Sequence, residues 1–146
     1  MHVESETVLP ATTAVAWRAL TDWERQAEWM RDADSVRVLT THREGPGVRI
    51  AVKTRVLNVP AFTEVLEVTE WNPPERLVVS HRGFVRGDGV WTLEPAPGGT
   101  RFLWVEMLSL PVPVLGALAL LVYRPFMRRL MRRALRDLGA SLSGSR

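Results

Sequence analysis

The sequence predicts an α+β fold in which an antiparallel sheet curls around a long C-terminal helix. Residues 7–30 read as the end of a strand followed by two short helices that carry three tryptophans. About eighty residues with the polar–apolar alternation of half-buried strands come next. Residues 112–140 then read as one helix, apolar in its first half and basic in its second. A sheet curled in this way encloses a cavity, so this order of elements indicates a protein that holds a small molecule.

Composition places the chain among folded proteins of single-domain size. Its 146 residues are enough to bury a core, and a hydrophobic content of 46% with six tryptophans argues against disorder. The lack of cysteine excludes disulfides and thiolate metal sites and fits a reducing compartment. Residues 1–10 contain no apolar run of signal-peptide length. We therefore expect a cytoplasmic protein with a single domain over residues 1–140 and a flexible tail over residues 141–146.

Charge is distributed unevenly along the chain. After residue 123 there are seven arginines and one aspartate, a balance of +6, whereas residues 1–123 carry −3. Lysine occurs once, beside 18 arginines. This excess of arginine over lysine can arise from coding preference as readily as from selection for contacts with phosphate groups. Because the body of the domain is mildly acidic, we predict no nucleic-acid partner.

The N-terminal segment predicts a strand and a bent pair of helices. Residues 6–9 read as the strand, which ends at Pro10. Pro10 can also stand at the start of the following helix, since proline is tolerated in the first turn of a helix. The first helix then continues to Leu20. Thr21 and Glu24 match a capping box, in which each side chain bonds to the other residue's backbone amide. A second helix is therefore expected over residues 22–30.

Alternation predicts six further strands. Glycine and proline clusters separate several of them, at residues 45–47, 58–61, 72–74 and 95–99. Because the links are short and one face of the strands is polar, neighbouring strands should pair in antiparallel fashion. Together with residues 6–9 they complete a seven-stranded sheet. The six expected strands are residues 35–41, 48–56, 62–71, 77–82, 85–93 and 101–110.

The closing helix has two halves of different character. Residues 112–123 contain no charged side chain, and a helix gripped by a sheet should be apolar over most of its girth. The second half places apolar side chains on one face and five arginines on the other. Pro125 lies between the two halves and should kink the helix or mark a restart.

Four passages together resemble the SRPBCC, or START-like, superfamily, the group described as polyketide cyclase/dehydrase and lipid transport. They are AVAWRALTDWERQAEWM at residues 14–30, REGPGVRI at 43–50, VLEVTEWNPPERLVVSHR at 65–82 and WTLEPAPGGTRFLWVEM at 91–107. The resemblance implies a helix-grip fold, in which a seven-stranded antiparallel sheet wraps the C-terminal helix, with two short helices between strands 1 and 2 and a mostly apolar cavity. Members range from carriers of lipids, sterols and polyketides to cyclases and hydroxylase subunits. The resemblance thus implies a pocket without naming its occupant.

Alternation also predicts which side chains line that cavity. If Val68 faces inward, the residues at even spacing from it do so too. The same reasoning applied to the other strands and the helix gives a mostly apolar wall with a few polar groups, the usual composition of a small-molecule site. The alternative is that these side chains fill a solid core. The predicted ligand-binding residues are Val52, Phe62, Glu64, Leu66, Val79, His81, Trp91, Phe102, Trp104, Glu106, Leu118, Val122 and Phe126.

Glu64, His81 and Glu106 are the polar exceptions in this wall and the candidate catalytic residues. Two carboxylates beside an imidazole suit acid–base chemistry, because burial raises a carboxyl pKa and a carboxylate fixes the imidazole tautomer. The group forms only if three strand registers are right, since a slip of one residue turns a side chain to solvent. Only three histidines are present, none at ligand spacing, so no metal site and no cofactor are predicted.

The uncharged segment over residues 110–123, which precedes the arginines, could in principle belong to a membrane-spanning helix. Residues 110–123 fall short of the ~20 apolar residues that a spanning helix needs, and they include two prolines. They are therefore predicted to form a core helix with a solvated arginine face behind it. In the alternative, the helix lies on an anionic membrane with its apolar stripe at the level of the headgroups. The contacting residues would then be Arg128, Arg129, Arg132 and Arg133.

The function predicted from these patterns is binding of one hydrophobic or amphipathic small molecule, such as a lipid, sterol or polyketide. The protein would act as a carrier, sensor or accessory protein. A polyketide cyclase, aromatase or dehydratase working through His81 and a carboxylate is the main alternative, and peripheral membrane association is a second. The sequence leaves the oligomeric state open.

Overall fold

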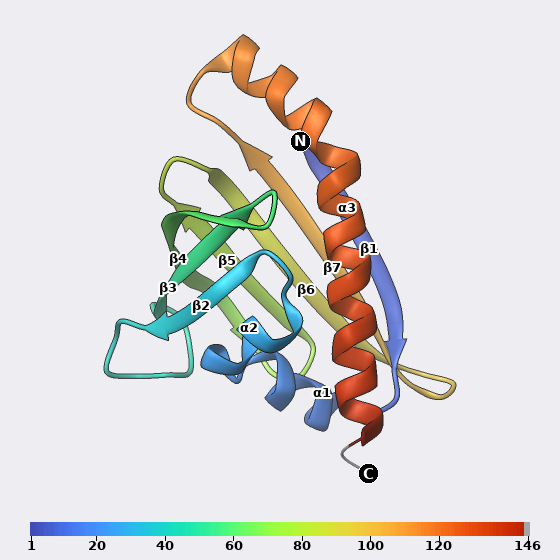
Figure 1. The fold of residues 1–146 in the computed structure, drawn as a ribbon. Helices are drawn as coiled ribbons and strands as arrows, with labels where there is room; N and C mark the ends of the chain where they lie inside the picture. Colours follow the sequence, from blue (N-terminus) through green and yellow to red (C-terminus); the bar gives the residue numbers. More distant parts are fainter. Residues whose placement is uncertain (145–146) are drawn as a thin grey trace.

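The computed structural model describes residues 1–144. Within them, seven strands form one antiparallel sheet in the spatial order β1-β7-β6-β5-β4-β3-β2 (Figure 1). The strands are β1 (His2–Leu9), β2 (Ala33–Val38), β3 (Arg49–Val56), β4 (Val59–Asn72), β5 (Arg76–Arg82), β6 (Arg86–Ala96) and β7 (Gly99–Ser109). The helices are α1 (Thr13–Leu20), the 3-10 turn η1 (Trp23–Arg25), α2 (Gln26–Trp29) and α3 (Pro113–Gly144). The predicted seven-stranded antiparallel helix-grip fold is confirmed.

The sheet curls, and its concave side faces α2 and α3 (Figure 1). The hydrophobic core lies toward the end of the domain where α1, α2 and the C-terminal half of α3 meet the sheet. Its helical members include Trp17, Trp23, Trp29 and Leu138, whereas no side chain from residues 113–126 belongs to it. One end of the domain is therefore solid, and the other is open to form a cavity.

The predicted capping box at Thr21 is wrong. Thr21 ends α1 instead, because its hydroxyl donates to the carbonyl of Trp17 at 2.8 Å. The cap that begins α1 is Thr12, whose Oγ1 accepts from the amide of Val15. The chain then continues into the 3-10 turn η1 and the single turn α2 rather than a full second helix. Buried Gln26 holds this segment against α1 by donating from Nε2 to the carbonyl of Leu20 at 2.7 Å.

The strands are longer than predicted at several ends. The expected break at residues 58–61 shrinks to a two-residue turn, because Leu57 and Asn58 adopt left-handed φ angles of 51° and 66°. Strand β4 then begins at Val59 and includes Pro60, next to a shift in register between Thr54 and Arg55 on β3. A bulge of this kind accommodates a residue that lacks an amide hydrogen.

Helix α3 departs most from prediction. Its first half projects beyond the sheet (Figure 1), and Val114, Leu118 and Val122 are 72%, 54% and 80% exposed. The prediction of a core helix over residues 112–123 is wrong for this segment. The reason is length: 32 residues at 1.5 Å each extend about 48 Å, whereas the 11 residues of β7 extend about 37 Å.

Pro125 lies inside α3, and the axis of this helix is not straight (Figure 1). A proline kinks a helix because it lacks an amide hydrogen and its ring crowds the preceding turn. At the other end α3 continues to Gly144, so residues 141–144 are helical rather than a tail, and Leu142 is buried in the core. Residues 145–146 of the predicted tail lie outside the described residues.

Candidate functional site

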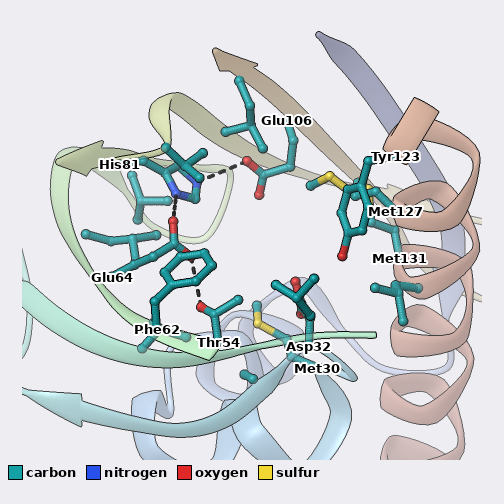
Figure 2. A pocket seen from close by; sticks show the side chains of 18 of the residues that line it. Met30, Asp32, Thr54, Phe62, Glu64, His81, Glu106, Tyr123, Met127 and Met131 are labelled. Carbon is teal, nitrogen blue, oxygen red and sulfur yellow. Dashed lines mark hydrogen bonds and ion pairs between the residues drawn. The ribbon is translucent and has the colours of Figure 1, made fainter. Parts of the chain in front are cut away.

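A cavity of about 350 Å³ lies between the concave face of the sheet, the segment around α2 and the middle of α3 (Figure 2). Its wall is mostly aliphatic, aromatic and methionine side chains. Phe62 and Phe84 line it while remaining 38% and 64% exposed, so they mark where it opens to solvent. The cavity is therefore accessible from outside.

Nine of the 13 predicted ligand-binding residues line this cavity. They are Val52, Phe62, Glu64, Leu66, Val79, His81, Trp91, Trp104 and Glu106. Phe102 has the predicted inward direction but lies at the solid end, fully buried, with its ring 5.8 Å from that of Trp91. Alternation along a strand gives the face of the sheet and says nothing about where along that face the core stops.

The other three predictions, on the helix, are wrong in register. Leu118 and Val122 point to solvent and Phe126 is half-buried outside the cavity. On α3 the cavity is lined instead by the residue after each predicted one, which gives Ala119, Tyr123 and Met127. Leu120, Leu130 and Met131 line it as well.

Glu64, His81 and Glu106 meet inside the cavity, as Figure 2 shows. His81 Nδ1 lies 3.1 Å from Glu64 Oε1, and His81 Nε2 lies 3.3 Å from Glu106 Oε2. The second oxygen of each carboxylate also accepts a hydrogen bond, Glu64 Oε2 from Thr54 Oγ1 at 2.9 Å and Glu106 Oε1 from Trp104 Nε1 at 2.8 Å. We call these five side chains the polar cluster.

Gly89 on β6 leaves room for this meeting. Strand β6 lies between β5, which carries His81, and β7, which carries Glu106. In the register, His81 faces Gly87 and Glu106 faces Gly89. A Cβ atom at Gly89 would lie 2.9 Å from Glu106 Oε1, so a larger residue would displace the carboxylate. The R-G-D-G sequence at residues 86–89 is the local signal that His81 and Glu106 reach each other across β6.

The charge state of His81 follows from its two carboxylate partners. Burial disfavours the cation, but the hydrogen bonds and negative charges of Glu106 and Glu64 outweigh burial and raise the pKa of His81 to about 10. The ring is therefore an imidazolium at neutral pH, with each N–H donating to a carboxylate.

Sequence reasoning missed several polar residues of the site, among them Asp32 and Tyr123. Both point into the cavity, from the loop before β2 and from α3 (Figure 2). Burial, reinforced by the charges of Glu106 and Glu64, raises the pKa of Asp32 to about 6, against the opposing effects of its own amide and of His81. Burial and the nearby Asp32 also raise the pKa of Tyr123. Asp32 lies in a loop, where alternation gives no direction, so the sequence carried no signal for it.

The described part of the chain contains no group of His, Asp and Glu side chains arranged to hold a metal ion. The site is thus an apolar cavity with the hydrogen-bonded polar cluster on the sheet and the Asp32 carboxyl on the other side of the cavity. A long helix gripped by a curled antiparallel sheet over such a cavity defines the helix-grip class of proteins.

The chain belongs to the family described as "Polyketide cyclase / dehydrase and lipid transport", whose pattern it matches over residues 1–143. No curated protein sequence matches it. Among solved structures it is similar to TTHA0849 from Thermus thermophilus, with 21% identity, a TM-score of 0.81 and 99% of each chain covered. It also resembles the di-domain ARO/CYC StfQ from the steffimycin biosynthetic pathway, with 13% identity and a TM-score of 0.77. That match covers 99% of this chain and 51% of StfQ, so the chain spans about half of that protein. At these identities the likenesses show the fold.

Proposed function

We propose that the protein binds one hydrophobic or amphipathic small molecule in the cavity between the sheet and α3, as a carrier, sensor or accessory protein. The observation that carries the proposal is the cavity of about 350 Å³ with apolar walls and a few convergent polar groups, the usual composition of a ligand site. Membership of a family that includes lipid transport supports it. Burial of apolar ligand surface would drive affinity, at about 25 cal/mol per Å².

The charge state of His81 weighs against the enzymatic alternative. A cyclase or dehydratase that removes a proton through His81 needs a ring nitrogen with a free lone pair. Both ring nitrogens lie within hydrogen-bond distance of carboxylates, and the pKa of His81 is raised to about 10. The imidazolium with its two carboxylates therefore serves better as a fixed polar wall than as a general base.

A matched pair of alanines on α3 tests the binding proposal. Both alanines are exposed, but Ala119 lines the cavity, whereas Ala117, two residues earlier on the same helix, lies outside it. Sterols, fatty alcohols and aromatic polyketides are titrated while tryptophan fluorescence is followed, since Trp91 and Trp104 lie in the wall. Ala119→Phe should weaken the binding of any hit at least tenfold, because its ring occupies ligand space, and Ala117→Phe should leave binding unchanged. Equal affinities of the two variants, or no hit at all, would refute the proposal.

We also propose that the exposed first half of α3 contacts a lipid surface when ligand is exchanged. Leu118, Leu121 and Val122 are all more than half exposed, and the neighbouring Ala119 and Leu120 line the cavity. Exposed apolar side chains of α3 therefore lie next to residues of the cavity wall. Within residues 1–144, none of the helices combines the length and hydropathy that a bilayer crossing requires, so contact would be peripheral.

The proposed lipid-contacting surface is thus the exposed first half of α3, in place of the arginine face that the sequence analysis considered. The apolar stripe that would have entered the headgroups, including Met131, Leu135 and Leu138, is buried in the core. The apolar segment before Pro125 is the part of α3 left for insertion, with Arg128 and Arg129 beyond it.

Vesicle sedimentation distinguishes the two surfaces. Leu118→Gln combined with Val122→Gln should reduce binding to vesicles of mixed zwitterionic and anionic lipids at least fivefold, because it removes the apolar side chains that would enter the bilayer. The control is Arg129→Gln combined with Arg133→Gln, two exposed residues of the same helix, which should change binding less than twofold. The reverse ranking would assign the contact to the arginines, and unchanged binding in both would remove membrane contact altogether.

A further inference from the structure

Most hydrogen-bond donors of the cavity wall are committed to partners inside the protein. The donations are Trp23 Nε1 to the Arg43 carbonyl (2.9 Å), Gln26 Nε2 to the Leu20 carbonyl (2.7 Å), Thr54 Oγ1 to Glu64 (2.9 Å) and Trp104 Nε1 to Glu106 (2.8 Å). Both ring nitrogens of His81 are engaged as well, and the N-terminal ammonium of Met1 donates to the Leu108 carbonyl at 2.7 Å. Trp91 Nε1 and the Tyr123 hydroxyl remain among the described donors of the wall, and the Tyr123 ring lies on the same side of the cavity as Asp32 (Figure 2). The wall therefore has few donors left for a ligand.

Acceptors, by contrast, are in surplus. A carboxylate has about four lone-pair positions, and Glu64 and Glu106 each use two of them. In the described residues no side-chain donor is hydrogen-bonded to Asp32, whose carboxyl points into the open space of the cavity (Figure 2). A ligand's polar end should therefore be a donor.

The net charge of the wall is negative. Among the described residues that line it are three carboxyl groups, those of Asp32, Glu64 and Glu106, and two cations, the imidazolium of His81 and the N-terminal ammonium of Met1, with neither a lysine nor an arginine. With Asp32 ionised, the wall carries one negative charge more than positive charges. A buried charge is costly unless it is paired, so a cation in this space would be stabilised.

We propose that the cavity selects apolar molecules that carry a protonated amine, held in the space between Asp32, Glu106 and Tyr123. This inference rests on the proposed function and narrows it to one chemical class. The amine supplies donors to the unused lone pairs of Asp32 and Glu106 and neutralises the charge of Asp32. The aromatic wall adds to the effect, because the faces of tryptophan and tyrosine rings attract cations.

Other amphiphiles fit this wall less well. A neutral alcohol donates one hydrogen bond but leaves the Asp32 charge unpaired. A carboxylate brings a further negative charge to a wall that already has an excess. The expected order of affinity is amine, then alcohol, then carboxylate.

The selectivity should depend on pH through Asp32. The groups that face it are Glu64 on β4, His81 on β5, Glu106 on β7 and Tyr123 on α3. The pKa of His81 is raised to about 10, and burial followed by the charge of Asp32 raises the pKa of Tyr123, so both shifts lead away from pH 6. Protonation of Asp32, with its pKa of about 6, should therefore weaken the binding of an amine at pH 5 relative to pH 8.

The test uses three probes with one ring system: naphthalen-1-ylmethylamine, naphthalen-1-ylmethanol and 1-naphthoic acid. Their dissociation constants are measured by isothermal titration calorimetry at pH 8 and pH 5 for the parent protein and for Asp32→Asn. The control variant is Asp34→Asn, because Asp34 lies two residues later and pairs with Arg55 and Lys53 away from the cavity. Circular dichroism verifies that each variant is folded.

We expect the amine to bind the parent protein at least tenfold more tightly than the alcohol at pH 8. The ratio of the alcohol dissociation constant to the amine dissociation constant should fall at least fivefold when the parent protein is moved to pH 5. It should fall by as much in Asp32→Asn at pH 8, and it should stay unchanged in Asp34→Asn at pH 8. Equal or tighter binding of the alcohol or the acid would overturn the inference while leaving a ligand cavity in place. An amine affinity unchanged by Asp32→Asn would also overturn it. Binding of none of the three probes overturns it too, and the Ala119→Phe comparison then decides separately whether the cavity binds ligands.

Discussion

Replacement of Asp32 by asparagine should raise the free energy of unfolding by about 3 kcal/mol at pH 8. The pKa of Asp32 is raised from 3.8 to about 6 in the folded protein, chiefly by burial. The folded state therefore binds the proton more tightly than the unfolded chain, and the parent protein loses stability as pH rises from about 4 to 6. Above pH 6 the full cost of the buried charge remains. Asparagine has nearly the same shape without that charge, so urea unfolding should show the gain at pH 8 and little of it at pH 4.

Asp34→Asn again serves as the control for this measurement. Asp34 forms ion pairs with Arg55 and Lys53, and the pKa of its carboxyl is lowered, first by the hydrogen bond from Arg55. Its replacement should be neutral or mildly destabilising at pH 8. A loss of stability in Asp32→Asn at pH 8 would contradict the charge assignment. A gain would mean that the chain keeps Asp32 at the expense of stability, as proteins do at functional positions.

Replacement of His81 by phenylalanine should destabilise the protein by about 3–5 kcal/mol, the usual cost of removing one partner of a buried ion pair. Glu64 and Glu106 would then face each other across the cavity wall without the cation between them, although their side chains are only 12% and 8% exposed. Urea unfolding at pH 7 measures the loss.

The control is the triple variant Glu64→Gln, His81→Phe, Glu106→Gln, which removes the charges together and should recover most of the stability. Equal losses in the single and triple variants would mean that phenylalanine fails for lack of space and not for reasons of charge. The two proteins should also differ in pH dependence. With a folded pKa of about 10 against an ordinary 6.5, His81 stabilises the parent protein fully below pH 6.5. That contribution is lost as pH rises toward 10, by about 1.4 kcal/mol per pH unit, and the triple variant should lack this slope.

The strands of this protein were predictable because alternation has a period of two, and the sheet has two different faces. The inward direction of Glu64, His81 and Glu106 follows from that pattern once Val68 is taken as buried. The meeting of His81 with Glu106 needed the register of β6 as well, in which Gly89 pairs with Glu106 and leaves space for its carboxylate. That glycine is visible in the sequence, but only the pairing of strands shows what it makes room for.

Helix α3 illustrates the opposite case. Residues 112–123 are uncharged on every side, so their sequence has no polar face to distinguish the side near the cavity from the side near solvent. The prediction chose Leu118 and Val122, whereas the structure turns Leu120 and Tyr123 inward. It also leaves the first half of the helix beyond the end of the sheet, because a helix of 32 residues is longer than the strands that it crosses.

The sequence by itself determined the order of elements, the antiparallel sheet and the inward face of its strands, since these depend on local periodicity and turn residues. Tertiary structure alone decided where the core ends and the cavity begins, which face of α3 closes it, and that Asp32 points into it. Each of these depends on contacts between segments far apart in the chain. A loop residue and a uniformly apolar helix carry no periodic signal of their own, so only packing against the sheet gives them a direction.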